Sequence, residues 1–142
     1  MAEPRLDHVG LAVADLGAAT RWYGEALGYE LELSLRVDAI DLDIAMLRHP
    51  GHGDRLELLC RPGSVPGPRH AGPAEAALVE AYGHVAFDVA DLDGTFTRLV
   101  GIGARAVLPP GPSPEAGVRM AFVADPEGNL VELLSRQPQE AP

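Results

Sequence analysis

Apolar and polar side chains alternate in the same way at two places along the chain, residues 8–13 and residues 84–89. Alternation with a period of two is typical of a strand with one buried face. In both stretches the apolar residues share one face, and the opposite face begins with a histidine, His8 or His84. We therefore expect two strands whose polar faces each start with an imidazole, and such a face is suited to lining a cavity.

Each of these strands leads into an Asp-Leu pair that is typical of a helix start. Asp15 and Asp91 have short side chains that accept hydrogen bonds from the exposed amides of a first helical turn. We expect the first helix to end at Gly28 and the second at Gly101 or Gly103, because glycine adopts the left-handed conformation at low cost. The predicted helices span 16–27 and about 92–100, and the other predicted strands span 29–37, 40–48, 55–60, 104–108, 118–124 and 129–135.

The two halves of the chain repeat one another. HVGLAVADL at 8–16 and HVAFDVADL at 84–92 agree at six of nine positions, and each copy ends downstream in ELL, at 57–59 and 132–134. A repeat of about 75 residues suits two copies of one βαβββ module.

This repeat predicts an α+β protein that forms one domain over residues 1–142. The first module is expected at 5–60 and the second at 83–136, joined at 61–82 by a connector rich in Pro and Gly. We expect a short helix over about 74–81 within that connector. A second Pro-rich stretch, 108–117, is expected to form a long loop inside the second module.

Composition limits the classes of partner. The chain has 11 Arg and Lys residues against 21 Asp and Glu, a net charge of −10, which disfavours nucleic acid and anionic membrane surfaces. No apolar run reaches the roughly 18 residues that a membrane helix needs. The start of the chain lacks the pattern of a signal peptide, and the single Cys60 fits a reducing compartment, so we expect a cytoplasmic protein.

The repeat also carries candidate metal ligands. His8 and Glu57 lie 49 positions apart in the first copy, and His84 and Glu132 lie 48 apart in the second. In both ELL stretches the glutamate points away from its apolar neighbours. Two imidazoles and two carboxylates would suit zinc, iron, nickel, cobalt or manganese, and an octahedral ion would keep two positions open for water or substrate.

The remaining polar candidates are weaker. His49 and His52 fall in a loop and are interpreted as solvated turn residues, and His70 lies in the connector. Asp88 shares the face of His84, where it is either a hydrogen-bond acceptor behind the metal ligands, a base, or an exposed carboxylate.

Several longer motifs resemble the vicinal oxygen chelate superfamily, which includes glyoxalase I, methylmalonyl-CoA epimerase, extradiol dioxygenases and bleomycin-binding proteins. The motifs are LDHVGLAVADLGAATRWYGEALGYEL at 6–31, RLELL at 55–59, GHVAFDVADLD at 83–93 and AFVADPEGNLVELL at 121–134. The resemblance implies two βαβββ modules forming a cupped mixed sheet around a central cavity, with the helices outside, usually within a homodimer. It also implies one divalent metal ion held by His8, Glu57, His84 and Glu132.

The resemblance to glyoxalase-like members implies an isomerase, epimerase or lyase acting on a small molecule. The ion would stabilise an enediolate after a carboxylate removes the proton next to a carbonyl, which implicates Glu132 first and Glu57 second as the base. Two departures argue against the familiar substrates. Ala12 stands where bacterial glyoxalase I has an arginine that contacts glutathione, and residues 37–41 lack the second catalytic glutamate of the epimerases.

Two other functions fit the same resemblance. An iron-dependent extradiol-type dioxygenase would use only His8, His84 and Glu132, leaving positions for a catechol and oxygen. A drug- or metabolite-binding protein of the bleomycin-resistance kind would need no metal, and the net charge of −10 would suit a cationic ligand.

Overall fold

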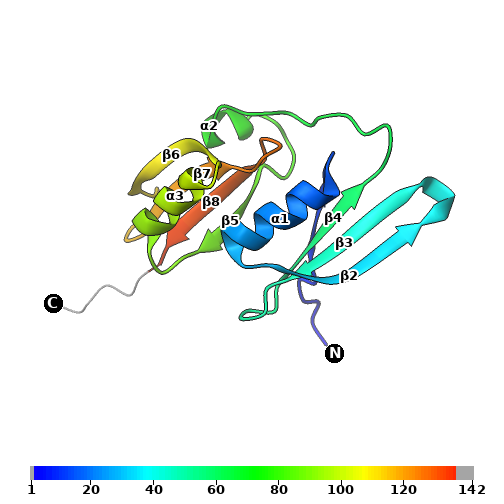
Figure 1. Cartoon of the computed structure of the whole chain (residues 1–142). Helices are drawn as coiled ribbons and strands as arrows, with labels where there is room; N and C mark the ends of the chain where they lie inside the picture. The colour runs from blue at the N-terminus through cyan, green and yellow to red at the C-terminus, as the bar shows by residue number, and fades with distance from the viewer. Residues whose placement is uncertain (1, 137–142) are drawn as a thin grey trace. The chain divides into compact units, whose positions relative to one another are not determined.

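The computed structural model describes residues 2–136, which divide into two compact units at the Gly67–Pro68 bond. Each unit contains a four-stranded mixed sheet, and residues 2–136 form three α-helices, so the predicted α+β class is confirmed (Figure 1). Over residues 2–136 no helix is both long enough and apolar enough to cross a membrane.

The first unit runs β1 (Val9–Ala12), α1 (Leu16–Leu27), β2 (Glu30–Val37), a 3-10 turn (Asp38–Ile40), β3 (Leu42–Arg48) and β4 (Arg55–Cys60). The strand order is β1-β4-β3-β2, in which β1 pairs parallel with β4 and the other pairs are antiparallel. Helix α1 packs on β3 and β4 through Ala19, Tyr23 and Ala26. That helix covers the face on which Leu47, Leu56 and Leu58 are buried.

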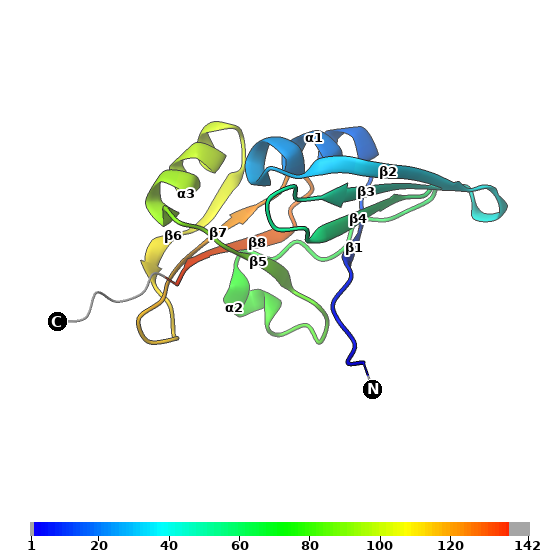
Figure 2. The ribbon, with the colours of Figure 1, turned by 90° about the horizontal axis from the view of Figure 1, so that it is seen from below.

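The second unit runs α2 (Pro73–Ala76), β5 (His84–Asp88), α3 (Leu92–Gly101), β6 (Arg105–Pro112), β7 (Arg119–Ala124) and β8 (Leu130–Ser135). Its order, β5-β8-β7-β6, has the same parallel pair followed by antiparallel pairs. Helix α3 packs over Ala121, Val123, Val131 and Leu133, all fully buried. Figure 2 shows α3 and the short α2 on opposite sides of this sheet.

Both predicted helix starts are confirmed. Asp15 accepts a hydrogen bond from the Ala18 amide at 2.9 Å, and Asp91 accepts one from the Gly94 amide at 3.0 Å. Helix α1 has the predicted bounds and ends at Gly28, whose φ of 78° is left-handed. These caps fix where each helix leaves the strand that carries the leading histidine.

Two predictions were wrong. The helix expected over 74–81 is only Pro73–Ala76, because Ala76 alone is buried while Leu78 is 83% exposed and the chain continues in turns. The Pro-rich stretch 108–117 is not all loop, because β6 extends to Pro112. Strand β6 lies at the sheet edge and its register shifts on either side of Leu108, so its prolines interrupt few ladder hydrogen bonds.

Candidate metal centre

The first unit places His8 beside Glu57. Gly10 of β1 lies opposite Glu57 of the parallel strand β4, and His8 is two residues earlier on the same face. The His8 Nε2 atom lies 3.7 Å from the Glu57 Oε1 atom. A Cβ atom at Gly10 would stand 3.6 Å from that same oxygen, an ordinary contact distance, so this position also has room for an alanine.

The second unit repeats this geometry. Ala86 of β5 lies opposite Glu132 of β8, again two residues after the histidine. The His84 Nε2 atom lies 3.0 Å from the Glu132 Oε2 atom, and the His84 ring meets the edge of Phe122 with centroids 5.3 Å apart. Each unit thus presents one imidazole and one carboxylate at a parallel strand pair, with His8 directly before β1 and His84 as the first residue of β5.

Both glutamates point away from the helix-covered face, as the alternation predicted. Their neighbours Leu56 and Leu58, and Val131 and Leu133, are buried. The carboxylates keep partial access to solvent, with side-chain exposures of 21% for Glu57 and 15% for Glu132. Neither carboxylate is therefore part of the buried core.

Asp7 is a site residue that was not predicted. Its Oδ2 atom lies 2.8 Å from the His8 Nδ1 atom, and this hydrogen bond is the main reason that the pKa of Asp7 is lowered. A carboxylate that accepts the Nδ1 proton leaves Nε2 with a free lone pair, which is how histidine ligands are commonly held for a metal. The repeat gave no signal for Asp7, since Gly83 stands in the equivalent place.

The structure brings the four predicted ligands together as two pairs. Across residues 2–136, no group of three or more His, Cys, Asp or Glu side chains is arranged to hold a metal ion. Asp88 accepts a hydrogen bond from the Arg136 amide at 3.3 Å. His49 and His52 stack on each other at the turn between β3 and β4.

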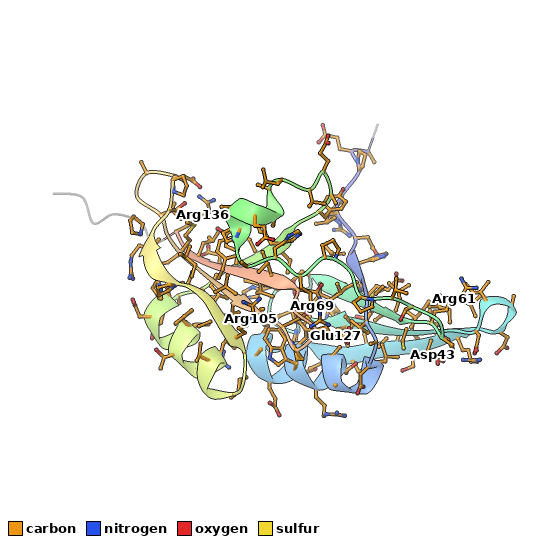
Figure 3. The ribbon with its side chains drawn as sticks, turned by 90° about the horizontal axis from the view of Figure 1, so that it is seen from above. Asp43, Arg61, Arg69, Arg105, Glu127 and Arg136 are labelled. Atoms are coloured by element: carbon orange, nitrogen blue, oxygen red, sulfur yellow. The ribbon has the colours of Figure 1, made fainter. Side chains whose placement is uncertain are left out.

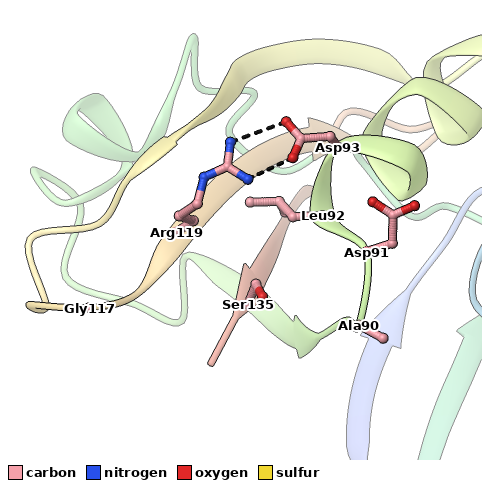
Figure 4. Close-up of a pocket in the computed structure, with 7 residues that line it drawn as sticks. All are labelled: Ala90, Asp91, Leu92, Asp93, Gly117, Arg119 and Ser135. Atoms are coloured by element: carbon pink, nitrogen blue, oxygen red, sulfur yellow. Dashed lines mark hydrogen bonds and ion pairs between the residues drawn. The ribbon is translucent and has the colours of Figure 1, made fainter. Parts of the chain in front are cut away.

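An open depression of about 360 Å³ lies elsewhere in the second unit, on the α3 side of the sheet (Figure 4). It is lined by Ala90, Asp91, Leu92, Asp93, Gly117, Arg119 and Ser135. Arg119 and Asp93 form an ion pair across it, with nitrogen to oxygen distances of 2.6 and 3.1 Å. None of the four predicted ligands lines this depression, so we do not assign the chemistry to it.

Comparison with known proteins supports the fold and the family. The chain is 28% identical over 142 residues to a probable lactoylglutathione lyase of Vibrio parahaemolyticus, covering 99% of this chain and 97% of that protein. The trypanothione-dependent glyoxalase I of Leishmania major superposes with a TM-score of 0.71 at 26% identity, covering 94% of this chain and 88% of that one. A glyoxylase/bleomycin resistance protein/dioxygenase domain from Frankia sp. has a TM-score of 0.77 at 23% identity, with 98% and 96% covered.

The match to a family extends over nearly the whole chain. Residues 5–133 match the Glyoxalase/Bleomycin resistance protein/Dioxygenase superfamily. This span contains β1 to β7, most of β8 and both imidazole–carboxylate pairs. The chain therefore belongs to the glyoxalase, bleomycin resistance protein and dioxygenase superfamily.

Proposed function

We propose that this protein is a divalent-metal-dependent enzyme of the glyoxalase type that moves a proton next to a carbonyl group of a small molecule. The observation that carries the proposal is the repeated pair, His8 with Glu57 and His84 with Glu132, at the same register positions of two equivalent parallel strand pairs. Together they supply two neutral nitrogen donors and two carboxylates, a donor set that fits a first-row divalent ion.

The proposed roles follow from the contacts of each side chain. His8 and His84 would bind the ion through Nε2, with Asp7 holding the His8 ring by its other nitrogen. A bound divalent ion supplies Lewis-acid stabilisation of negative charge developing on a carbonyl oxygen. Glu132 would accept the substrate proton, because its carboxylate is the less exposed of the two and lies 3.0 Å from the His84 imidazole. Glu57 would be the alternative base.

The substrate class is proposed as small molecules with an enolisable carbonyl. Relatives named probable lactoylglutathione lyase support a lyase or isomerase. Ala12 follows His8 by four residues on the same strand face and offers only a methyl group, so it provides no donor for an anionic thiol carrier. The hemithioacetal of glutathione and methylglyoxal therefore belongs in the assay as one compound among several enolisable carbonyls.

Metal content and activity test this proposal together. We expect elemental mass spectrometry to find about one divalent ion per chain in protein prepared without a metal-binding tag, because each chain contains both pairs. The double variant His84→Ala, Glu132→Ala should lose both the ion and proton exchange at the carbon next to the carbonyl. His70→Ala is the matched control, because His70 lies in the connector and is not one of the four predicted ligands.

Two outcomes would favour the other functions. Iron as the single supporting metal, with oxygen consumed on a catechol, would favour a dioxygenase that uses His8, His84 and Glu132. If neither the unchanged protein nor the double variant binds metal after reconstitution with nickel, cobalt, zinc, manganese and iron, the result would favour a drug- or metabolite-binding protein.

We also infer that two copies associate. The outer strand β2 presents Leu33, Leu35 and Val37 on one face with exposures between 40% and 47%, a row of apolar side chains that is costly to leave in water. Light scattering should give the mass of a dimer, and Leu35→Glu should shift it towards the monomer. A monomeric mass for the unchanged chain would contradict this inference.

A further inference from the structure

The face of the second sheet that bears His84 and Glu132, here called the site face, extends beyond this pair. Glu132 lies opposite Phe122, and the next residue on that face of β8, Leu134, lies opposite Met120 and Asp88. Alternation carries the same face on to Arg136, which directly follows β8. An apolar strip formed by Phe122, Met120 and Leu134 thus separates the carboxylate of Glu132 from a cation.

Arg136 is held in place from two sides. Its backbone amide donates to Asp88, and its guanidinium donates to both oxygens of Glu115, at 2.6 and 2.8 Å. The Glu115 hydrogen bond is the main reason that the pKa of Arg136 is raised, and the charges of Asp88 and Glu132 add to it. The attraction to Glu132 shows that the guanidinium lies within electrostatic range of the candidate metal ligand.

Among residues 2–136, Glu115 is the acceptor of the Arg136 guanidinium. Arginine has five N–H donors in a planar fork, and Glu115 takes one from each terminal nitrogen. Glu115 therefore fixes the plane of the fork, and no other acceptor within residues 2–136 takes the three remaining donors. Such a preorganised fork suits a carboxylate.

The other arginines near this sheet are placed differently. Arg105 donates to the backbone oxygen of His70 at 3.5 Å, and the side chain of Arg69 packs against Gly128 (Figure 3). Arg119 lies on the other face of the sheet, where it pairs in register with Ser135 of β8 and donates to the carboxylate of Asp93. Of these four arginines, Arg136 lies on the site face and also interacts with the charge of Glu132.

We propose that Arg136 binds a carboxylate at the far end of a substrate whose carbonyl is held at His84 and Glu132. This rests on the proposed function and makes the substrate an anionic carbonyl compound. Arg136 lies four residue steps after Glu132, roughly 13 Å along an extended chain, and the two long side chains shorten that gap. The apolar strip would contact the carbon chain between the two ends. Glu115 is a positioning residue in this scheme.

Arg119 provides a matched control. Arg136 with Glu115 and Arg119 with Asp93 are both bidentate pairs at similar exposures, 48% and 56% against 49% and 65%, on opposite faces of one sheet. Removing either guanidinium changes the net charge by the same amount. Only Arg136→Gln removes a cation from the site face.

The test compares probes that differ only in the distal carboxylate. The binding of 2-oxoadipate and of 2-oxohexanoate is measured by calorimetry and by NMR titration, with and without added divalent metal. The unchanged protein should prefer the diacid by about 10-fold, as expected for one charged hydrogen-bonded contact. Arg136→Gln should reduce the ratio to about one, Arg136→Lys should retain part of it, and Arg119→Gln should leave it unchanged. Longer 2-oxo diacids locate the chain length that fits best.

The outcomes separate this proposal from the proposed function. An equal ratio in the unchanged protein and in Arg136→Gln, or an equal loss in Arg136→Gln and Arg119→Gln, overturns the anion site even if the enzyme is active. A diacid-specific shift of the Arg136 Nε–H resonance in metal-free protein supports the anion site even if no metal binds and no turnover is found. Melting temperatures of the two glutamine variants should agree, which excludes a folding defect as the cause.

Discussion

The turn between β7 and β8 should be sensitive to one buried carboxylate, that of Asp125. Asp125 is 5% exposed and precedes the strand that carries Glu132. Its Oδ1 atom accepts from the Glu127 amide at 3.0 Å and the Asn129 amide at 2.9 Å, and the Asn129 side chain donates to both oxygens. Gly128 completes the turn in the left-handed region, at φ 90°.

The expected cost follows from these partners. Asp125→Ala leaves two backbone amides and one side-chain amide without acceptors, at about 1–3 kcal/mol for each fully buried group. Glu127 and Asn129 are half-buried, so water recovers part of this cost. We expect a loss of about 2–4 kcal/mol in the free energy of unfolding. Asp125→Asn keeps one oxygen for the backbone amides and should lose only about 1–2 kcal/mol.

Urea unfolding followed by two probes measures this effect. Trp22 is the single tryptophan and lies in the first unit, so its fluorescence reports that unit, whereas ellipticity reports both. The ellipticity midpoint of Asp125→Ala should fall by roughly 2 M urea for a slope of about 1.5 kcal/mol per molar. Asp91→Ala is the control, an exposed helix cap in the same unit worth about 1 kcal/mol. A midpoint for Asp125→Ala no lower than that of Asp91→Ala would refute the reasoning.

Three further perturbations have expected outcomes. His49→Ala should lower the free energy of unfolding by about 1–2 kcal/mol and His49→Asp much less, because Nδ1 of His49 accepts from two turn amides at 3.1 Å; equal losses in urea melts would contradict this. Burial and the hydrogen bond to Asp54 raise the pKa of Tyr29. The stabilisation that Tyr29 provides is therefore fully present below its ordinary pKa of about 10 and is lost as pH rises further. In a plot of melting temperature against pH, Tyr29→Phe should reduce the fall at high pH. Arginine hydrogen bonds lower the pKa of Asp93 and Glu115, so their stabilisation is present above pH about 4 and lost as pH falls; added salt should shrink this small effect.

The sequence predicted the parts of the fold that depend on local chemistry. Asp15 and Asp91 accept the helix amides as expected, and Gly28 ends α1 because the required φ is positive. The face of each glutamate followed from strand alternation, which depends only on the period of two. The parallel register that brings each glutamate to its histidine needed the structure, because pairing is a long-range property.

The errors arose where tertiary contacts outweigh local preference. The helix-favouring run after Ala76 does not continue as a helix, because nothing in its own unit covers Leu78. The prolines of β6 are tolerated because that strand is at an edge, which the sequence alone does not indicate. Asp7 was missed for a third reason: Gly83 stands in its place in the second copy, so self-similarity gave no signal for it. Arg136 has Arg61 in the equivalent place of the first copy, two residues beyond the shared ELL motif, so the motif alone did not single it out.

Residues that match between the two copies can be compared with residues that differ, beginning with the turns between β3 and β4 and between β7 and β8. Asp125 and His49 hold equivalent turns by accepting amides two residues further on, so the turn persists although the side chain differs. The aspartates at the helix starts are the same in both copies, and capping explains them. His8 and His84, and Glu57 and Glu132, also match between the copies, yet the imidazole–carboxylate contacts within each copy are partly exposed, and such contacts contribute little stability. Since these contacts stabilise the fold little, the matching residues in both copies favour the proposed metal ion, and not folding, as the reason for the match.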